Sequence, residues 1–361
     1  MHGSRLRALR IGLFALGAAA LLPARLVLAG APTAALPASC DAQGNLQFVC
    51  GPTAAEDLVR VEGTPWLIGS GLREPDAPGR LHLIDSANKR WEAAWPSRGA
   101  LVSADTKRFP DCTAPPEPSA FSAHGLAIRK TGADRHSLLV VNHGGREAVE
   151  FFEISSRGSK PALTWVGCVR MPPDVYLNSV VQLPDGGFLA TQFYSASDGG
   201  MAKILTGAVT GGVLEWRSGR NVVEIPGTGL SGANGIEIAS RGRVIYVAAW
   251  GTREIVRFDR RGKTLQKDVV SVGDFAPDNL RWTPRGQLLV AGQRFQPGET
   301  AVELQGWRIV SVSPETLAIT PVHSADATVP LQGASVALEV DGQIWVGPFR
   351  GDRVGYLPVP R

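Results

Sequence analysis

The sequence predicts an all-β fold, a six-bladed β-propeller with four-stranded blades. Three observations predict it: the composition, a recurring strand pattern, and a polar residue at the same place in each repeat. Glycine and proline account for 42 and 26 of the 361 residues, and residues that break helices this often leave little room for long ones. Because 44% of the residues are hydrophobic, the chain is not disordered and has the length to bury a large core.

Residues 1–31 are predicted to be a secretory signal peptide. Arginines are concentrated in the first ten residues, residues 11–22 are apolar, and residues 29–31 fit a small-residue cleavage site. The apolar run is shorter than the ~20 residues that cross a membrane, so we expect no stable transmembrane span in the mature protein. The alternatives are an uncleaved anchor and a lipoprotein signal ending at Cys40. Residues 32–361 are predicted to form a single propeller domain, secreted or periplasmic.

The formal net charge of +4 comes from this signal. Residues 1–31 contain four arginines and no lysine, aspartate or glutamate, so the rest of the chain is neutral. A neutral domain gives no electrostatic reason to expect nucleic acid as a partner.

Export makes the four cysteines candidates for disulfide bonds, and four cysteines allow three pairings. We favour Cys40–Cys50, which closes a short loop, and Cys112–Cys168, which would pin the proline-rich segment 110–118. Metal binding by these thiols is the alternative, but no Cys-x-x-Cys spacing supports it.

One pattern recurs six times from residue 56 onward: a polar residue, an alternating apolar strand, a turn with glycine and a second apolar strand. The polar residues that mark the copies are Glu56, His124, Asn178, Asn234, Asp278 and Ser335. Their spacing of 44 to 68 residues leaves room for the four strands of a propeller blade. A sandwich or barrel is the alternative, but neither explains the matching polar residues, which in a propeller begin the innermost strands and meet at one mouth of the channel.

The last copy contains only three clear strands and ends with residues 353–357. Residues 46–50, just before the first copy, form an additional strand candidate that would cover its open edge. We therefore expect the N-terminal strand to close the last blade.

Five side chains at the predicted mouth are candidate ligands of a metal ion. They are Glu56, Asn178, Asn234, Asp278 and Asn279. Carboxylate and amide oxygens around one axis suit Ca²⁺, whereas zinc prefers cysteine and histidine, and a divalent cation offsets the cost of burying two carboxylates together. The alternative is that these residues only cap turns before strands, which their repeat-equivalent positions disfavour.

Two histidines are predicted to lie at the same mouth. His124 begins the inner strand of the second copy and His143 ends the next strand, so an antiparallel hairpin places them side by side. A neutral imidazole beside a metal-bound substrate is a natural general base for water; the alternative is that His143 only belongs to a turn. The other histidines are expected at the surface or in the signal: His2, His82, His136 and His323.

Aromatic residues at or just after the ends of second strands are expected to shape an apolar substrate pocket at this mouth, although packing is an alternative role for them. They are Trp66, Phe193, Tyr194, Trp250 and Phe349.

Several segments resemble the paraoxonase (arylesterase) family. They are residues 121–128 (FSAHGLAI), 138–154 (LLVVNHGGREAVEFFEI), 234–238 (NGIEI) and 331–336 (LQGASV). Glu56-Asp57-Leu58 and Asp278-Asn279 are similar to the wider calcium-dependent gluconolactonase and regucalcin-like superfamily, and the likeness covers nearly all of residues 50–357 in order. The resemblance implies a six-bladed propeller, a catalytic calcium on the five candidate ligands, and a histidine dyad at His124 and His143.

Two positions depart from that family. Paraoxonases have an aspartate after the third-blade asparagine that helps to hold a second, buried calcium, and here that position is Ser179. Asp57 remains, but the loss of one carboxylate leaves the second ion in question. The cysteines that tie the two chain ends together in paraoxonases also have no counterpart near this C-terminus.

The sequence thus predicts a calcium-dependent hydrolase of lactones or related small-molecule esters, in which calcium polarises the carbonyl group and His124, assisted by His143, activates water. Asp278 is the alternative base, which the sugar-lactonase branch implies. No Gly-x-Ser-x-Gly motif suggests a covalent route. The alternative functions are a non-catalytic propeller that binds a ligand or partner around a structural metal, and a strictosidine-synthase-like lyase.

Overall fold

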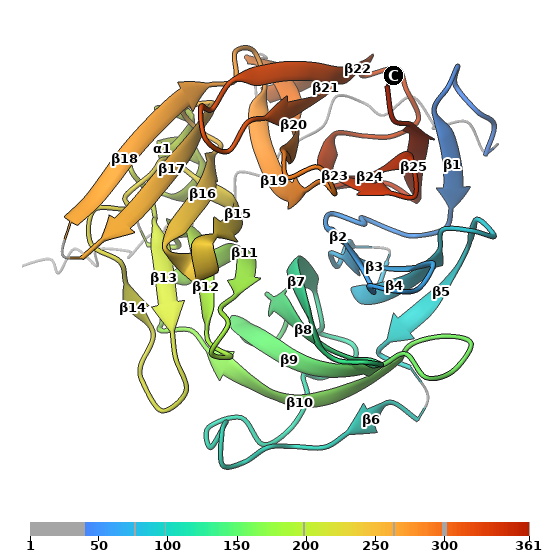
Figure 1. Cartoon of the computed structure of the whole chain (residues 1–361), viewed down its shortest axis with the longest axis vertical. Helices are drawn as coiled ribbons and strands as arrows, with labels where there is room; N and C mark the ends of the chain where they lie inside the picture. The colour runs from blue at the N-terminus through green and yellow to red at the C-terminus, as the bar shows by residue number, and fades with distance from the viewer. Residues whose placement is uncertain are drawn as a thin grey trace, which may run out of the picture.

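Six β-sheets surround a central channel in the computed structural model, which describes residues 40–360 except 76, 98, 198, 263 and 298–301 (Figure 1). The predicted six-bladed propeller is therefore confirmed. The predicted signal, residues 1–31, and the start of the predicted domain, residues 32–39, lie outside the described residues.

Within each blade the strands follow the chain from the channel outward, except that the N-terminal strand is outermost in the sixth blade (Figure 1). The first blade contains β2 (Leu58–Arg60), β3 (Trp66–Gly71), β4 (Arg80–Asp85) and β5 (Arg90–Trp95). The second contains β7 (Ala123–Gly132), β8 (Arg135–Asn142), β9 (Ala148–Ser155) and β10 (Ala162–Arg170). The third contains β11 (Val175–Gln182), β12 (Phe188–Ser195), β13 (Val213–Trp216) and β14 (Val223–Glu224). The fourth blade contains β15 (Ala233–Ala239), β16 (Val244–Ala249), β17 (Glu254–Arg261) and β18 (Thr264–Ser271). The fifth contains β19 (Ala276–Trp282), β20 (Leu288–Pro297), β21 (Val302–Val312) and β22 (Ile319–Asp326). The sixth contains β23 (Ala334–Val340), β24 (Gln343–Pro348), β25 (Arg353–Pro358) and β1 (Gln47–Cys50).

Short elements lie outside this plan. Strand β6 (Leu101–Val102) adds a parallel fifth strand to the second blade. The helical segments of the described residues are α1 (Gly200–Leu205), which follows β12, and the 3₁₀ turn η1 (Ser240–Gly242). Among the described residues, no helix has both the length and the apolar character needed to cross a membrane.

The N-terminal strand closes the ring as predicted. Strand β1 pairs antiparallel with β25 from Gln47 opposite Tyr356 to Cys50 opposite Arg353. The Tyr356 hydroxyl also donates a hydrogen bond to Oε1 of Gln47 (2.7 Å). The two ends of the propeller are thus joined by strand pairing, which covers the edge of the last blade.

Both predicted disulfide bonds are present, Cys40–Cys50 and Cys112–Cys168. The first holds the segment before β1, and the second ties the proline-rich segment to β10. Because all four sulfurs are bonded, the alternatives that needed a free thiol, a metal site or a lipid on Cys40, do not fit this structure.

The core lies between neighbouring blades, as β16 illustrates. All six of its residues are buried. Ile245, Val247 and Ala249 belong to the apolar cluster shared with the third blade. Val244, Tyr246 and Ala248 belong to the cluster shared with the fifth blade. Because successive side chains of a strand point to opposite faces, a continuous apolar run is what a blade packed on both faces requires.

Candidate functional site

The innermost strands of blades two to six each contain a register shift at the predicted channel residues. The shifts span His124 in β7, Asn178 in β11, Asn234 in β15, Asp278 and Asn279 in β19, and Ser335 in β23. In the first blade, Glu56 lies two residues before the start of β2. A β-bulge bends its strand and changes the direction of its side chains, and here the bulges turn polar residues of several blades toward the channel.

Two glycines permit neighbouring bulges to approach closely. A Cβ on Gly125 would lie 2.5 Å from the carbonyl oxygen of Asn178, and a Cβ on Gly235 would lie 2.4 Å from that of Asp278. Each glycine directly follows a predicted site residue, so the His-Gly and Asn-Gly pairs of the sequence have a steric reason.

The structure brings all five predicted metal ligands together. Glu56, Asn178, Asn234 and Asp278 line one cavity of about 230 Å³. Asn279 adjoins them, because its Nδ2 donates a hydrogen bond to Oε1 of Glu56 (2.7 Å). All five side chains are buried.

Each of these five residues has one buried side-chain oxygen without a hydrogen-bond partner. The atoms are Glu56 Oε2, Asn178 Oδ1, Asn234 Oδ1, Asp278 Oδ1 and Asn279 Oδ1. Leaving a buried polar atom unpaired costs free energy, and five at one site form the oxygen donor set that a hard cation such as Ca²⁺ accepts. The residues therefore fit the predicted ion.

The electrostatics of the site also favour a bound cation. Burial raises the pKa of Asp278 well above its ordinary value, and the nearby Glu56 carboxylate raises this pKa further. A bound cation would oppose both effects, because it favours the ionised form of each carboxyl group.

Gln293 on β20 supports this site and was not predicted. Its Nε2 donates to Oδ2 of Asp278 (2.7 Å), and its Oε1 accepts a hydrogen bond from Nε1 of Trp250 (3.2 Å). Only one oxygen of Asp278 is thereby left for a metal. Ser335, predicted only as a repeat marker, donates to the main-chain oxygen of Glu56 (2.6 Å) and so holds the ligand segment before β2.

The two predicted histidines are in contact beside the metal ligands. Nδ1 of His124 lies 2.7 Å from Nε2 of His143, and Nε2 of His124 lies 3.5 Å from Oε2 of Glu56. Nδ1 of His143 lies 2.9 Å from Oε2 of Glu147. Burial lowers the pKa of His124, but the charge and hydrogen bond of Glu56 and the charges of Asp57 and Glu147 together outweigh it, so the pKa of His124 is raised. Burial lowers the pKa of His143.

Glu147 was missed by the sequence analysis. The loop after His143 brings it back onto the imidazole, and its Oε1 also accepts the main-chain N–H of Leu177 (2.7 Å) in the third blade. An acidic residue four positions after His143 was the only signal in the sequence.

Aromatic side chains form the walls of the cavity, four of them as predicted: Phe193, Tyr194, Trp250 and Phe349. Tyr176 adds a wall that was not predicted, because its ring stacks on His143 on one side and on Tyr194 on the other, with centroids 4.3 and 4.6 Å apart. The placement of Trp66 was wrong: it begins β3, whereas the cavity lies at the end of this strand, and its Nε1 donates to the main-chain oxygen of Ser159.

Two histidines expected at the surface are buried. His82 is 0% and His136 1% exposed. They lie in β4 and β8, and Nε2 of His82 lies 2.9 Å from the main-chain oxygen of Thr53. Neither lines the candidate site.

Comparisons with known proteins identify relatives of this chain. The sequence model of the arylesterase family matches residues 68–351. Serum paraoxonase/arylesterase 1 of Homo sapiens is 24% identical over 323 residues, which cover 84% of this chain and 86% of the relative. Serum paraoxonase/arylesterase 2 of Homo sapiens is 26% identical over 290 residues, which cover 76% and 75%.

Solved structures share the fold. A luciferin-regenerating enzyme superposes with a TM-score of 0.57 at 13% identity, covering 86% of this chain and 94% of that one. A gluconolactonase from Xanthomonas campestris superposes with a TM-score of 0.53 at 16% identity, covering 87% and 89%.

Proposed function

Because the chain belongs to the arylesterase family, we propose that it is a calcium-dependent hydrolase of lactones or related small-molecule esters. The observation that supports this most strongly is that five buried oxygens without hydrogen-bond partners lie together at one mouth of the channel, beside an aromatic cavity that His124 of the histidine pair also lines. The two disulfide bonds fit an oxidising compartment, so we also propose that the protein is secreted or periplasmic.

The five oxygen donors would hold the ion. They are Glu56, Asn178, Asn234, Asp278 and Asn279. When bound, calcium would supply Lewis-acid polarisation of the carbonyl oxygen of the substrate. Gln293 keeps Asp278 oriented through the hydrogen bond between Nε2 and Oδ2, and Asn279 does the same for Glu56.

The histidine pair would carry out the proton transfers. The Glu147 carboxylate accepts the Nδ1 proton of His143, so Nε2 of His143 accepts the proton on Nδ1 of His124. Nε2 of His124 is then unprotonated in the neutral imidazole and can take a proton from the water that attacks the carbonyl carbon. The same nitrogen returns this proton to the leaving oxygen as the ester bond breaks, while Glu56 stabilises the transient imidazolium.

A panel of lactones and aryl esters tests the proposal, assayed with the purified protein before chelation, after chelation, and after calcium is returned. Turnover should disappear with the chelator and return with calcium. Turnover that survives complete chelation contradicts the calcium dependence. If no lactone or ester is hydrolysed by the calcium-loaded protein, the hydrolase assignment is wrong, and a non-catalytic propeller around a structural metal remains.

A further inference from the structure

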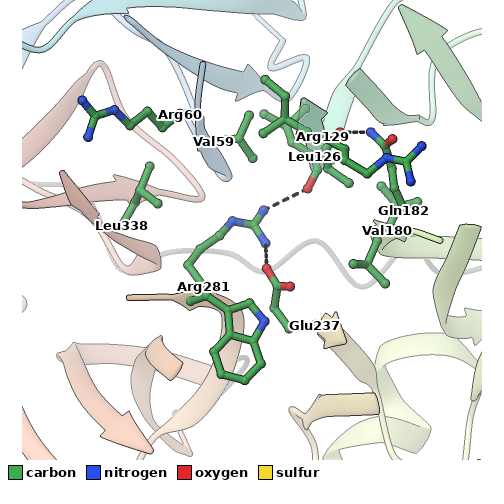
Figure 2. Close-up of a pocket in the computed structure, with 13 residues that line it drawn as sticks. Val59, Arg60, Leu126, Arg129, Val180, Gln182, Glu237, Arg281 and Leu338 are labelled. Atoms are coloured by element: carbon green, nitrogen blue, oxygen red, sulfur yellow. Dashed lines mark hydrogen bonds and ion pairs between the residues drawn. The ribbon is translucent and has the colours of Figure 1, made fainter. Parts of the chain in front are cut away.

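Arg281 lies inside the channel, on the inner strand of the fifth blade and two residues after the ligand Asn279. Its side chain is 6% exposed. Figure 2 shows it reaching across the channel toward Glu237 and Leu126. Arg281, Glu237 and Leu126 also line a second cavity of about 240 Å³. This cavity lies at the end of the channel opposite the predicted metal ligands.

Every N–H of this guanidinium has an acceptor. Nη2 donates to a carboxylate oxygen of Asp57 and to the main-chain oxygen of Leu126 (3.0 Å). Nη1 donates to Oε1 of Glu237 (3.3 Å) and to the main-chain oxygen of Leu280 (2.9 Å). Nε donates to the main-chain oxygen of Leu58 (3.1 Å). The five donors of an arginine are thus all used, and the acceptors come from the first, second, fourth and fifth blades.

Asp57, which directly follows the ligand Glu56, has both of its carboxylate oxygens bound by donors of the protein. Its Oδ1 accepts the N–H of Leu58 (2.8 Å), and its Oδ2 accepts the N–H of Leu126 (2.7 Å) in addition to Arg281. This differs from the metal ligands, each of which keeps an unpaired oxygen.

The residues at this depth do not fit a second calcium. The family resemblance implies an acidic partner for Asp57 at position 179, but Ser179 stands there, next to the same part of the channel: a Cβ on Gly125, the neighbour of Leu126, would lie 2.5 Å from its Cα. Arg281 already binds the carboxylates of Asp57 and Glu237 and the main-chain oxygen of Leu126. The Ser179 hydroxyl oxygen, which has no hydrogen-bond partner, is a neutral donor and does not replace the missing carboxylate.

We propose that the Arg281 guanidinium is the permanent cation of this level of the channel, so that the protein binds one calcium ion per chain and not two. The inference rests on the proposed function for its single ion. The second cation has become part of the polypeptide and does not exchange with the solvent.

The first test is the calcium content of the unmodified, purified protein, measured by elemental analysis after equilibration with calcium and by titration of the metal-free protein. We expect one ion per chain. Two ions overturn this inference and leave the proposed hydrolase intact. No ion overturns the calcium site itself, and the proposed function with it.

The second test recreates the missing site. The Arg281→Gln, Ser179→Asp double variant removes the guanidinium and adds a carboxylate, so it should bind two ions per chain, while Arg281→Gln alone should still bind one. Arg60→Gln is the matched control, because Arg60 forms an exposed ion pair with Asp341 at the same end of the channel, and it should leave the count at one. A folded double variant that still binds one ion contradicts the placement of Arg281 in the position of a cation; the measurement on the unmodified protein does not depend on any variant folding.

Discussion

Buried negative charge is balanced differently at two levels of the channel. At the ligand level, defined by Glu56, Asn178, Asn234, Asp278 and Asn279, each side chain keeps a buried oxygen without a hydrogen-bond partner. At the arginine level, defined by Asp57, Glu237 and Arg281, the carboxylates are paired with a cation that belongs to the chain. The levels are directly connected, because Glu56 and Asp57 are consecutive residues.

The difference separates chemistry from stability. A guanidinium whose five N–H groups are all used has no free position for a substrate. A bound metal ion can accept a further oxygen in its coordination sphere. We therefore assign catalysis to the ligand level and the joining of the blades to the arginine level, and the following predictions test this division.

The largest expected effect is on stability, from replacing the cation of the arginine level. Arg281→Met leaves the Asp57 carboxylate buried without its partner and should lower the free energy of unfolding by about 3–5 kcal/mol. The measurement is denaturant unfolding at saturating calcium. Arg60→Met, which breaks an exposed ion pair, should cost less than about 1 kcal/mol. Equal effects from the two variants would remove the distinction between the levels.

The next effect is on catalysis, from a change at the ligand level. Glu56→Gln removes one of two formal negative charges from the metal site and should lower kcat/KM by about 10²–10³-fold, the size of losing one group that stabilises charge in the transition state. It should also reduce the rise in melting temperature that calcium causes. Glu62→Gln is the control, since Glu62 forms only an exposed pair with Lys130. An unchanged calcium response in Glu56→Gln contradicts its role as a ligand.

Glu147 tests the histidine relay with a smaller change. Glu147→Gln removes a charge that raises the pKa of both His124 and His143, and we expect kcat to fall by roughly 10–100-fold. Because the base then has a lower pKa, the acid limb of the pH–rate profile should move to lower pH. A reduced rate with an unmoved profile would mean that Glu147 only supports the loop through its bond to Leu177.

The sequence predicted the ligand level but not the arginine level, for a physical reason. The ligands are polar residues at equivalent points of a repeat, so symmetry of position indicated a shared function. Arg281 lies in an alternating strand, where a charged residue is ordinarily expected on a solvated face. The charges that make its burial favourable, on Asp57 and Glu237, come from blades distant in the sequence.

Other errors have similar causes. Gln293 and Glu147 lie outside the repeated inner strands, so no repeat-equivalent position indicated them. Trp66 was placed at the wrong end of its strand, because an apolar run does not by itself show which end reaches the channel. The disulfides and the ring closure were predictable, because each depends on few possible partners.

His82 provides the smallest predicted effect and a third case, a buried group with no counter-charge. Burial lowers its pKa from 6.5 to about 4. The hydrogen bond that its ring donates to the main-chain oxygen of Thr53 opposes this shift, and the charge of Arg80 adds to it. Between these values the unfolded chain binds more protons than the folded one, so stability falls as the pH decreases through this window. From pH 7 to pH 5 the loss attributable to His82 should be about 2 kcal/mol.

His82→Gln should flatten the stability profile over this pH range by that amount, as measured by denaturant unfolding at saturating calcium. His323→Gln is the matched control, because His323 is half-buried and burial lowers its pKa in the same direction but by a smaller amount. Both channel levels are unchanged in these variants, so a flattened profile assigns the acid sensitivity to the blade interior. An equally steep profile in His82→Gln would contradict this assignment. The acid sensitivity would then have to come from other groups, such as the carboxylates of the channel.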